Sequence, residues 1–362
     1  MRMNGMANRY VVLDGLRGVA AAAVVLYHFG SENASGIAAH GYLAVDFFFV
    51  LSGFVIASAY EKRLASTLSV PDFVVQRVIR LYPMIVIGLM VWLAIWLAGL
   101  DRTLTSPVAN VAMLLLMALL LIPYEGDQST LLFPVNPPLW SLSSEMLINV
   151  IYGLISPSLK TKVLLPAVLI MVGLYVLIGV QRHDLHLGFA NGTWLLGVLR
   201  TAALFGAGVL TWRFHRVAKL PLLTSNGLAV GLAIALFGFF MLPSLPGLNG
   251  MLHLAAAFVA FPALVLAGSQ IATGPKLSLA CDLSGRLSYP VYVLHLPIVA
   301  AAAHQWRASE PVLAALIALV VLTAVSALAW LALMIDEPVR DYLSKLIRKR
   351  RTSAIGASAN IT

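Results

Sequence analysis

The chain has few charged residues and a single cysteine. Of its 362 residues, 11% are charged and 60% are hydrophobic, and its mean hydropathy is +0.91. A soluble domain carries about 25% charged residues, so this composition predicts a polytopic membrane protein. No polar stretch is long enough to form a soluble domain, and we therefore expect one membrane domain.

Missing motifs exclude several classes of function. The one cysteine, Cys281, excludes an intrachain disulfide and a cysteine-rich metal site. The sequence also lacks an HExxH pair, and we expect no metal and no permanently bound cofactor. It has neither a GxxxxGKS/T phosphate loop nor a GxSxG nucleophile elbow, so an ATP-driven pump and a serine hydrolase have no support.

The net charge of +9 is a signal of orientation. Lys and Arg lie in short connections between apolar segments and near the C-terminus, where the positive-inside rule places them. We therefore expect both termini in the cytoplasm and no nucleic-acid partner. We expect a membrane domain over residues 1–346 and a disordered basic cytoplasmic tail over residues 347–362. The sequence leaves the oligomeric state open, homo-oligomers included.

Eleven apolar segments are candidates for membrane spans. Their ranges are 10–29, 41–59, 82–100, 107–123, 139–157, 163–180, 194–212, 222–242, 251–270, 287–303 and 311–334. Two cytoplasmic termini require an even number of crossings. One of the two segments within 82–123 is therefore expected to be re-entrant, tilted or incomplete, and the sequence does not say which. The predicted fold is an all-α polytopic bundle of about 10 transmembrane helices.

The first apolar segment carries charged and titratable groups, which are rare in membrane spans. Arg17 and His28 are separated by almost three whole helical turns, which places them on one face roughly 16 Å apart. Asp14, three residues before Arg17, shares that face. This arrangement predicts a cation near one membrane surface and an imidazole near the other.

Residues 60–81 are too polar to span the membrane. Pro71 and the apolar residues after it predict a short interfacial helix. Arg77 and Arg80 lie one turn apart and point the same way, so they are candidates for a phosphate clamp at the cytoplasmic surface. The alternative is a pair of juxtamembrane arginines that contact lipid headgroups.

Further polar residues interrupt the later spans. Asp46 needs a partner, and Arg17 or His28 is the natural candidate; a structural ion pair is the alternative. Helical spacing places Ser141, Ser144 and Glu145 on one face; the alternative is that the serines bond to backbone carbonyls. The remaining candidates are Ser52, Trp140, Arg200, Tyr292 and His295. We assign no role to the histidines at loops and span ends, which are His40, His183, His186, His215, His253 and His304.

These motifs together resemble the integral-membrane acyltransferase-3 family, which includes bacterial O-acetylases of surface glycans. The matching stretches are LDGLRGVAAAAVVLYH, GYLAVDFFFVLSGFVIA, RVIRLYP, PPLWSLSSEMLINVIY, SYPVYVLHLPI and IDEPVRDYL. Each is weak alone, but the six occur in order over nearly the whole chain. The resemblance implies a multi-pass protein of the bacterial cytoplasmic (inner) membrane that transfers an acyl group from acyl-CoA to a hydroxyl.

The resemblance also implies roles for individual residues. Arg17 and His28 would both be required, with His28 as the catalytic residue. Arg77, Arg80 and Tyr82 would bind acyl-CoA. Asp14, Asp46, Ser141, Glu145 and His295 would line the site. The partners are then acyl-CoA, most simply acetyl-CoA, a glycan or other saccharide acceptor, and membrane lipids.

Residue chemistry and resemblance lead to one hypothesis for the mechanism. His28 acts as general base on the acceptor hydroxyl, since imidazole titrates near neutral pH. Asp46 or Glu145 orients His28, and Arg17 or Tyr292 stabilises the oxyanion. An acyl-histidine intermediate is the variant. The competing interpretations are a proton-coupled transporter with the same buried groups and a structural or lipid-scrambling subunit.

Overall fold

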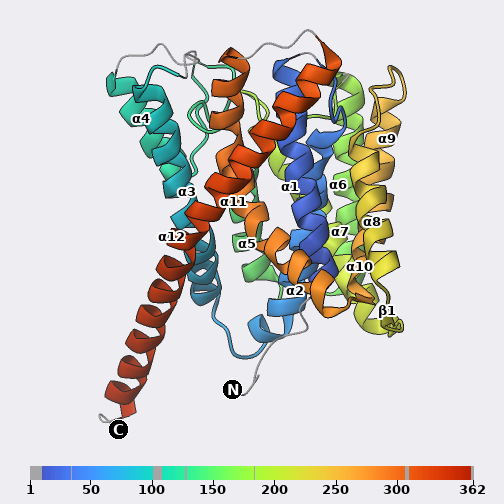
Figure 1. Ribbon diagram of the computed structural model, residues 1–362. Coiled ribbons are helices and arrows are strands. Elements are labelled where there is room, and N and C mark those ends of the chain that lie inside the picture. Colours follow the sequence, from blue (N-terminus) through green and yellow to red (C-terminus); the bar gives the residue numbers. More distant parts are fainter. Residues whose placement is uncertain are drawn as a thin grey trace.

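The computed structural model describes residues 10–33, 35–100, 108–126, 129–182, 184–305 and 310–359. Nearly all of them are helical. The elements are α1 (Val11–Glu32), η1 (Gly41–Leu43), α2 (Ala44–Leu64), α3 (Val70–Leu97), α4 (Val108–Leu119), α5 (Leu139–Ile155), α6 (Thr161–Arg182), α7 (Trp194–Ala218), β1 (Leu223–Thr224), α8 (Asn226–Phe240), α9 (Asn249–Ala255), η2 (Ala256–Ala260), α10 (Phe261–Ser269), β2 (Ile271–Ala272), α11 (Pro275–Gln305) and α12 (Pro311–Ala359). Figure 1 shows the helices as a bundle of roughly parallel rods.

The prediction of an all-α polytopic membrane protein is confirmed. Seven of the described helices are long and apolar enough to cross a membrane, and α5 and α8 are shorter apolar helices of the same bundle. The α9–η2–α10 segment counts as one rod, with its π-helical turn η2 directly before Pro262, which cannot donate a backbone hydrogen bond. These nine rods and α11, which is not among the candidate spans, make ten described rods when α4 is set aside.

The two apolar segments within 82–123 differ in the length of the helix described for each. The α3 helix is long enough to cross a membrane, whereas the described part of α4 has 12 residues, a length of about 18 Å, against a hydrocarbon core about 30 Å thick. Figure 1 shows α4 confined to the upper part of the bundle, beside the upper half of α3. Residues 101–107 lie outside the described residues, and the prediction that one of the two segments does not cross stays a prediction.

The predicted separate interfacial helix within 60–81 is wrong. Residues 70–81 are the first three turns of α3, which continues past Pro83 to Leu97. The Ser69 side chain caps the start of α3 by accepting a hydrogen bond from the backbone N–H of Asp72. Pro83 removes one backbone donor, but the apolar residues that follow it pack within the bundle, and the helix does not break.

Helix α12 extends farther than the predicted membrane domain. It has 49 residues and continues to Ala359, so residues 347–359 are helical where we expected disorder. This stretch contains Lys, Arg and Ala and no proline, and it extends a helix that has already begun. The last three residues of the predicted tail, and residues 1–9 of the predicted domain, lie outside the described residues.

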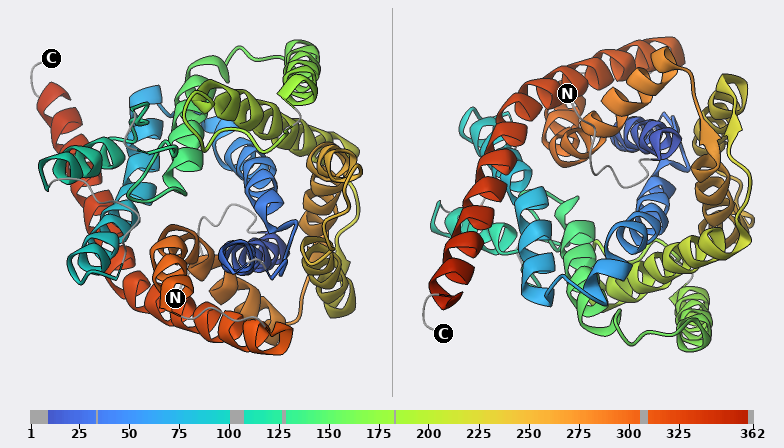
Figure 2. Two further views of the ribbon diagram at one scale, coloured as in Figure 1. Left: turned by 90° about the horizontal axis from the view of Figure 1, so that it is seen from above. Right: turned by 90° about the horizontal axis from the view of Figure 1, so that it is seen from below.

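Small residues allow the central helices to approach closely. A Cβ atom on Gly285 of α11 would lie 2.6 Å from the Cβ of Asp14 on α1. Between α2 and α7, a Cβ on Gly53 would lie 2.0 Å from the carbonyl oxygen of Phe205, and Gly208 meets Val50 in the same way. Viewed along the bundle in Figure 2, α1, α2, α3, α5 and α11 surround a central region, and α6 lies outside α7.

The two ends of the bundle differ in charge. The start of α1 and the end of α12 lie at the same end, the lower one in Figure 1. The short parallel pairing of β1 with β2 also lies there. We call this end the basic end, because the helix ends and connections there carry Lys62, Arg63, Lys160, Lys162, Arg216, Lys219 and Lys276. The other is called the opposite end.

Candidate active site

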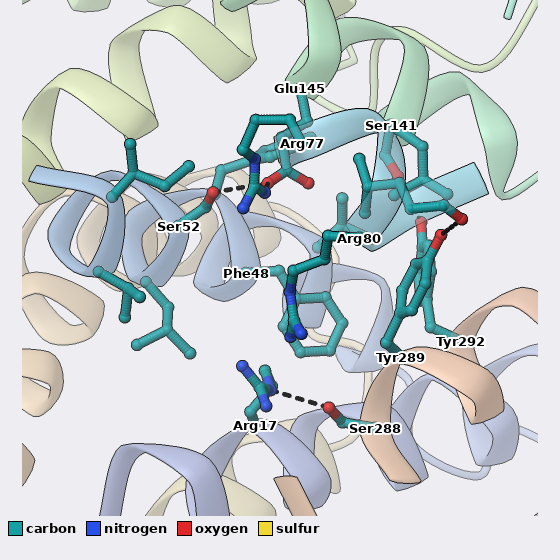
Figure 3. Close-up of a pocket in the computed structure, with 17 residues that line it drawn as sticks. Arg17, Phe48, Ser52, Arg77, Arg80, Ser141, Glu145, Ser288, Tyr289 and Tyr292 are labelled. Carbon is teal, nitrogen blue, oxygen red and sulfur yellow. Dashed lines mark hydrogen bonds and ion pairs between the residues drawn. The ribbon is translucent and has the colours of Figure 1, made fainter. Parts of the chain in front are cut away.

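A cavity lies inside the bundle toward the basic end. It has a volume of about 150 Å³ and is lined from α1, α2, α3, α5 and α11. A wider mouth of about 480 Å³ shares Arg17, Arg77, Arg80 and Tyr289 with it and reaches α12. Figure 3 shows the polar residues that line the inner cavity, which are Arg17, Ser52, Arg77, Arg80, Ser141, Glu145, Ser288, Tyr289 and Tyr292.

Arg17 is held at the wall of this cavity by two helices. Its Nη2 forms an ion pair of 3.1 Å with Oδ1 of Asp14, as the helical spacing predicts. Its Nε donates to Oγ of Ser288 at 2.8 Å, and Nη2 donates to the carbonyl oxygen of Gly285 at 2.7 Å. The close approach at Gly285 brings α11 within reach of the guanidinium, which therefore has a fixed position.

Glu145 joins three helices on the other side of the cavity. The Ser52 hydroxyl donates to Oε1 of Glu145 at 2.6 Å, and Nη2 of Arg77 approaches the same oxygen at 3.5 Å. Three residues that the sequence analysis found on separate helices, α2, α3 and α5, thus meet (Figure 3). Arg77 is partly neutralised by this contact.

Arg80 extends into the cavity between Arg77 and Arg17 (Figure 3). Its electrostatic neighbours include Arg17, Arg77 and Arg340, all of the same sign. Within the part of the chain that the structure describes, Arg80 has no hydrogen-bond or ion-pair partner. A guanidinium among other guanidiniums, open to a cavity, is suited to bind a multiply charged anion.

The mouth contains ion pairs that the sequence analysis did not identify. Arg286 of α11 forms a two-pronged contact with Glu337 of α12, at 2.9 and 2.7 Å. Arg340 pairs with Asp336 at 2.7 Å one turn away on α12. The i,i+4 spacing of Asp336 and Arg340 was a signal for that pair. Nothing in the sequence indicated that α12 would reach the mouth.

The inner end of the cavity is closed by Tyr292, Ser141 and Phe48. The Tyr292 and Ser141 hydroxyls lie 2.7 Å apart, and the Ser141 hydroxyl also donates to the carbonyl oxygen of Pro138 at 3.0 Å. The Phe48 ring packs edge-on against Tyr292, with centroids 5.6 Å apart. Ser144 instead donates to the carbonyl oxygen of Trp140, the structural alternative considered above.

Two imidazoles lie beyond this closed end. His295 follows Tyr292 by one turn of α11, and their ring centroids are 5.8 Å apart. The His28 ring lies 5.1 Å from that of His295. Neither histidine is among the residues that line the cavity or its mouth. The predicted single site therefore consists of an arginine cavity and a histidine pair, separated by the Tyr292 layer.

The predicted partner of Asp46 is wrong. Both oxygens of Asp46 bind Arg200, at 2.6 and 2.9 Å, and Nε2 of His253 approaches Oδ2 at 3.0 Å. Asp46 and Arg200 are completely buried. The α2–α7 contact places Arg200 opposite Asp46, whereas Arg17 lies in the half of α1 nearer the basic end. Trp140 adds a ring 5.8 Å from the Arg200 guanidinium.

Aromatic rings surround His28 toward the opposite end. The Tyr27 ring is 5.0 Å from His28, and Tyr42 and His186 lie 4.8 Å apart beside Tyr27. His186, to which we assigned no role, is in the loop between α6 and α7. Burial and the nearby Arg200 charge lower the pKa of His186 to about 3. His186 is therefore uncharged near neutral pH.

Tyr82 does not lie in the cavity with Arg77 and Arg80, the residues with which it was predicted to bind acyl-CoA. It packs partly buried against the hydrophobic core and is absent from the cavity lining. Tyr289 occupies the wall near Arg80 instead, and its hydroxyl donates to the carbonyl oxygen of Leu81 at 2.7 Å. Among the described residues, no group of three or more His, Cys, Asp or Glu could hold a metal ion.

Several bacterial proteins are similar in sequence to parts of this chain. A protein from Rhizobium radiobacter, described as protein 2 in the picA locus, is 37% identical over 161 residues, 40% of this chain and 81% of that protein. A putative O-acetyltransferase of Staphylococcus aureus strain COL is 37% identical over 86 residues, and a putative peptidoglycan O-acetyltransferase of Bacillus subtilis is 35% identical over 95 residues. The alignments cover 23% and 25% of this chain, but only 14% of each of these two relatives.

No solved structure matches the chain. The family model described as "Acyltransferase domain" matches residues 10–331. That range includes the arginine cavity and the histidine pair, and leaves out the part of the mouth formed by α12. The match spans most of the sequence, so the chain belongs to the acyltransferase-3 family and is an integral-membrane acyltransferase.

Proposed function

We propose that this protein transfers an acyl group, most simply acetyl, from acyl-CoA at the basic end to a hydroxyl of a saccharide acceptor, with His28 as general base. The observation that carries the proposal is the order of groups along the bundle. An arginine-lined cavity opens at the basic end and stops one layer short of two imidazoles. Family membership favours this reading over a proton-coupled transporter.

The arginines fit the phosphate-bearing half of the donor. Coenzyme A carries several phosphate charges, and guanidinium groups bind phosphate oxygens through paired hydrogen bonds. Arg80 is the main phosphate-binding residue, because its charge is unpaired within the described residues. Arg17 and Arg77 contribute further guanidinium groups from fixed positions. The wide mouth accommodates the nucleotide, and the narrower cavity accommodates the pantetheine arm, with the thioester toward Tyr292.

The chemistry then takes place at the Tyr292 layer. His28 removes the proton from the acceptor hydroxyl as the oxygen forms a bond to the thioester carbon. The C–S bond breaks, and the CoA thiolate takes up the proton from His28. The Tyr292 hydroxyl, which contacts Ser141 in this structure, would turn its hydrogen from Ser141 to the developing oxyanion. Arg17 is anchored on α11 about 16 Å from His28 along α1, so we assign it to donor binding instead.

The acceptor is proposed to bind from the opposite end. Tyr27, Tyr42 and His186 present rings beside His28, and aromatic faces can pack against the apolar faces of sugars. Two relatives are described as O-acetyltransferases, one of them of peptidoglycan, which supports a glycan hydroxyl as the acceptor. The basic end would then face the cytoplasm of a bacterial inner membrane, as the distribution of Lys and Arg predicts.

The test uses purified protein in nanodiscs with acetyl-CoA and crude cell-envelope glycans. We expect glycan-dependent release of CoA, and a loss of at least about 100-fold in His28→Gln. His215→Gln is the matched control, because His215 lies at the end of α7 near the basic end. Folding of each variant is checked by size exclusion and thermal unfolding. A folded wild-type protein that neither binds nor consumes acyl-CoA would overturn the proposal.

A further inference from the structure

The protonation of His295 is determined by its contact with the backbone. Nδ1 of His295 lies 2.7 Å from the carbonyl oxygen of Tyr292. A carbonyl oxygen only accepts hydrogen bonds, so Nδ1 carries the hydrogen. In the neutral ring, Nε2 is then a lone-pair acceptor. This side chain is fully buried, and within the described residues its Nε2 has no hydrogen-bond partner.

A buried acceptor without a hydrogen-bond partner lowers the stability of the folded protein, so its presence in a native structure needs an explanation. On the neighbouring helix α1, the His28 ring faces the His295 ring, with centroids 5.1 Å apart. A small rotation of either ring brings nitrogen edges at this separation into hydrogen-bonding range. The unpaired Nε2 therefore has an available donor in an N–H of His28.

The carboxylates expected to orient His28 are engaged elsewhere. Asp46 is bound by Arg200 and His253, and Glu145 by Ser52 and Arg77. A histidine that acts as a base needs a third group to fix which of its nitrogens carries the hydrogen. His295, whose ring packs beside His28, has a buried ring nitrogen without a partner among the described residues, and this nitrogen is suited to that task.

We propose that His295 is the positioning residue for His28, a role that rests on the proposed acyl transfer. Nε2 of His295 accepts the N–H of His28 and leaves the other His28 nitrogen as the base toward the acceptor. The proton from the acceptor hydroxyl moves to that nitrogen. The N–H between the two rings stabilises the imidazolium until the proton passes to the departing CoA thiolate. His295 itself contacts neither substrate.

Two amide substitutions separate this role from packing. In His295→Gln, the amide oxygen occupies roughly the place of Nε2 and keeps the acceptor for His28. In His295→Asn, the amide nitrogen replaces Nδ1, which keeps the contact with Tyr292 but removes the acceptor. We expect His295→Gln to retain kcat within about 10-fold, and His295→Asn to lose about 100-fold in kcat at unchanged KM for acetyl-CoA.

A second measurement does not depend on turnover. Protein labelled with ¹⁵N-histidine reports the tautomer of His28, whose signals are identified by their absence in His28→Gln. We expect one His28 tautomer in the wild type and in His295→Gln, and a mixture in His295→Asn. An unchanged His28 tautomer in folded His295→Asn would overturn the inference, as would equal losses of kcat in the two variants. If no wild-type transfer is found, the proposed function fails, and the tautomer still decides whether His295 holds His28.

Discussion

The two halves of the site differ in whether their charged side chains are paired. Toward the basic end, Arg80 has no partner within the described part of the chain, and Arg77 is only loosely paired, beside a cavity of about 150 Å³ that opens into the mouth. Toward the opposite end, the buried Asp46 is bound by both Arg200 and His253. An unpaired charge can be kept next to water but not in the dry interior. The comparison indicates that arginines near the cavity bind ligand, whereas Arg200 holds the fold.

The largest effect is expected from breaking the buried pair. Arg200→Ala leaves the Asp46 carboxylate buried with only His253 beside it, and loss of one partner of a buried ion pair costs about 3–5 kcal/mol. We expect a lower thermal midpoint and a low yield of folded protein. The control is Arg216→Ala, since the Arg216 side chain is 57% exposed and its pair with Glu61 should be worth less than about 1 kcal/mol.

The double variant Asp46→Leu/Arg200→Leu sharpens this test. It removes both charges together, so no unpaired carboxylate is left, and we expect it to recover much of the stability lost in Arg200→Ala. If Arg200→Ala is as stable as Arg216→Ala, the assignment of Arg200 to the fold is incorrect.

A smaller effect, on binding instead of stability, is expected at Arg80. Arg80→Ala should raise the KM for acetyl-CoA by about 10- to 100-fold, the value of one or two charge-assisted hydrogen bonds, while the thermal midpoint stays close to wild type. Arg63→Ala is the control, because Arg63 is an exposed arginine of the same end that does not line the cavity.

A shortened acyl donor tests which part of acetyl-CoA Arg80 contacts. S-Acetylpantetheine carries the same thioester but no phosphate, so Arg80→Ala and wild type should use it equally. A comparable loss with both donors would place Arg80 near the reacting thioester, contrary to the division of the site proposed above.

Much of this arrangement could be predicted from sequence, because helical spacing fixes which residues share a face. The Asp14–Arg17 pair followed from helical spacing alone. The prediction that one segment within 82–123 does not cross rested on the distribution of charge, and it stays a prediction. Periodicity describes single helices well.

Contacts between helices could not be predicted in the same way. Asp46 pairs with Arg200 and not with Arg17, because close packing at Gly53 and Gly208 places α7 against α2. The separation of His28 from the cavity depends on the Tyr292 layer, which requires the relative heights of α2, α5 and α11. The unpaired Nε2 of His295 depends on one backbone contact that no sequence pattern specifies.

The smallest effect tests whether the histidine end is as dry as the comparison implies. His186 has a pKa of about 3 in the folded protein, below the ordinary value of about 6.5 that it regains on unfolding. Between these values the unfolded state binds the extra proton, so this contribution lowers stability as the pH falls below about 6.5. In His186→Gln that contribution is absent, and the thermal midpoint should fall less steeply between pH 6.5 and about 4.5 than in wild type, with little difference at pH 8. Equal slopes in the two proteins would mean that water reaches His186, and that the neutral, water-excluded half of the site is confined to His28 and His295.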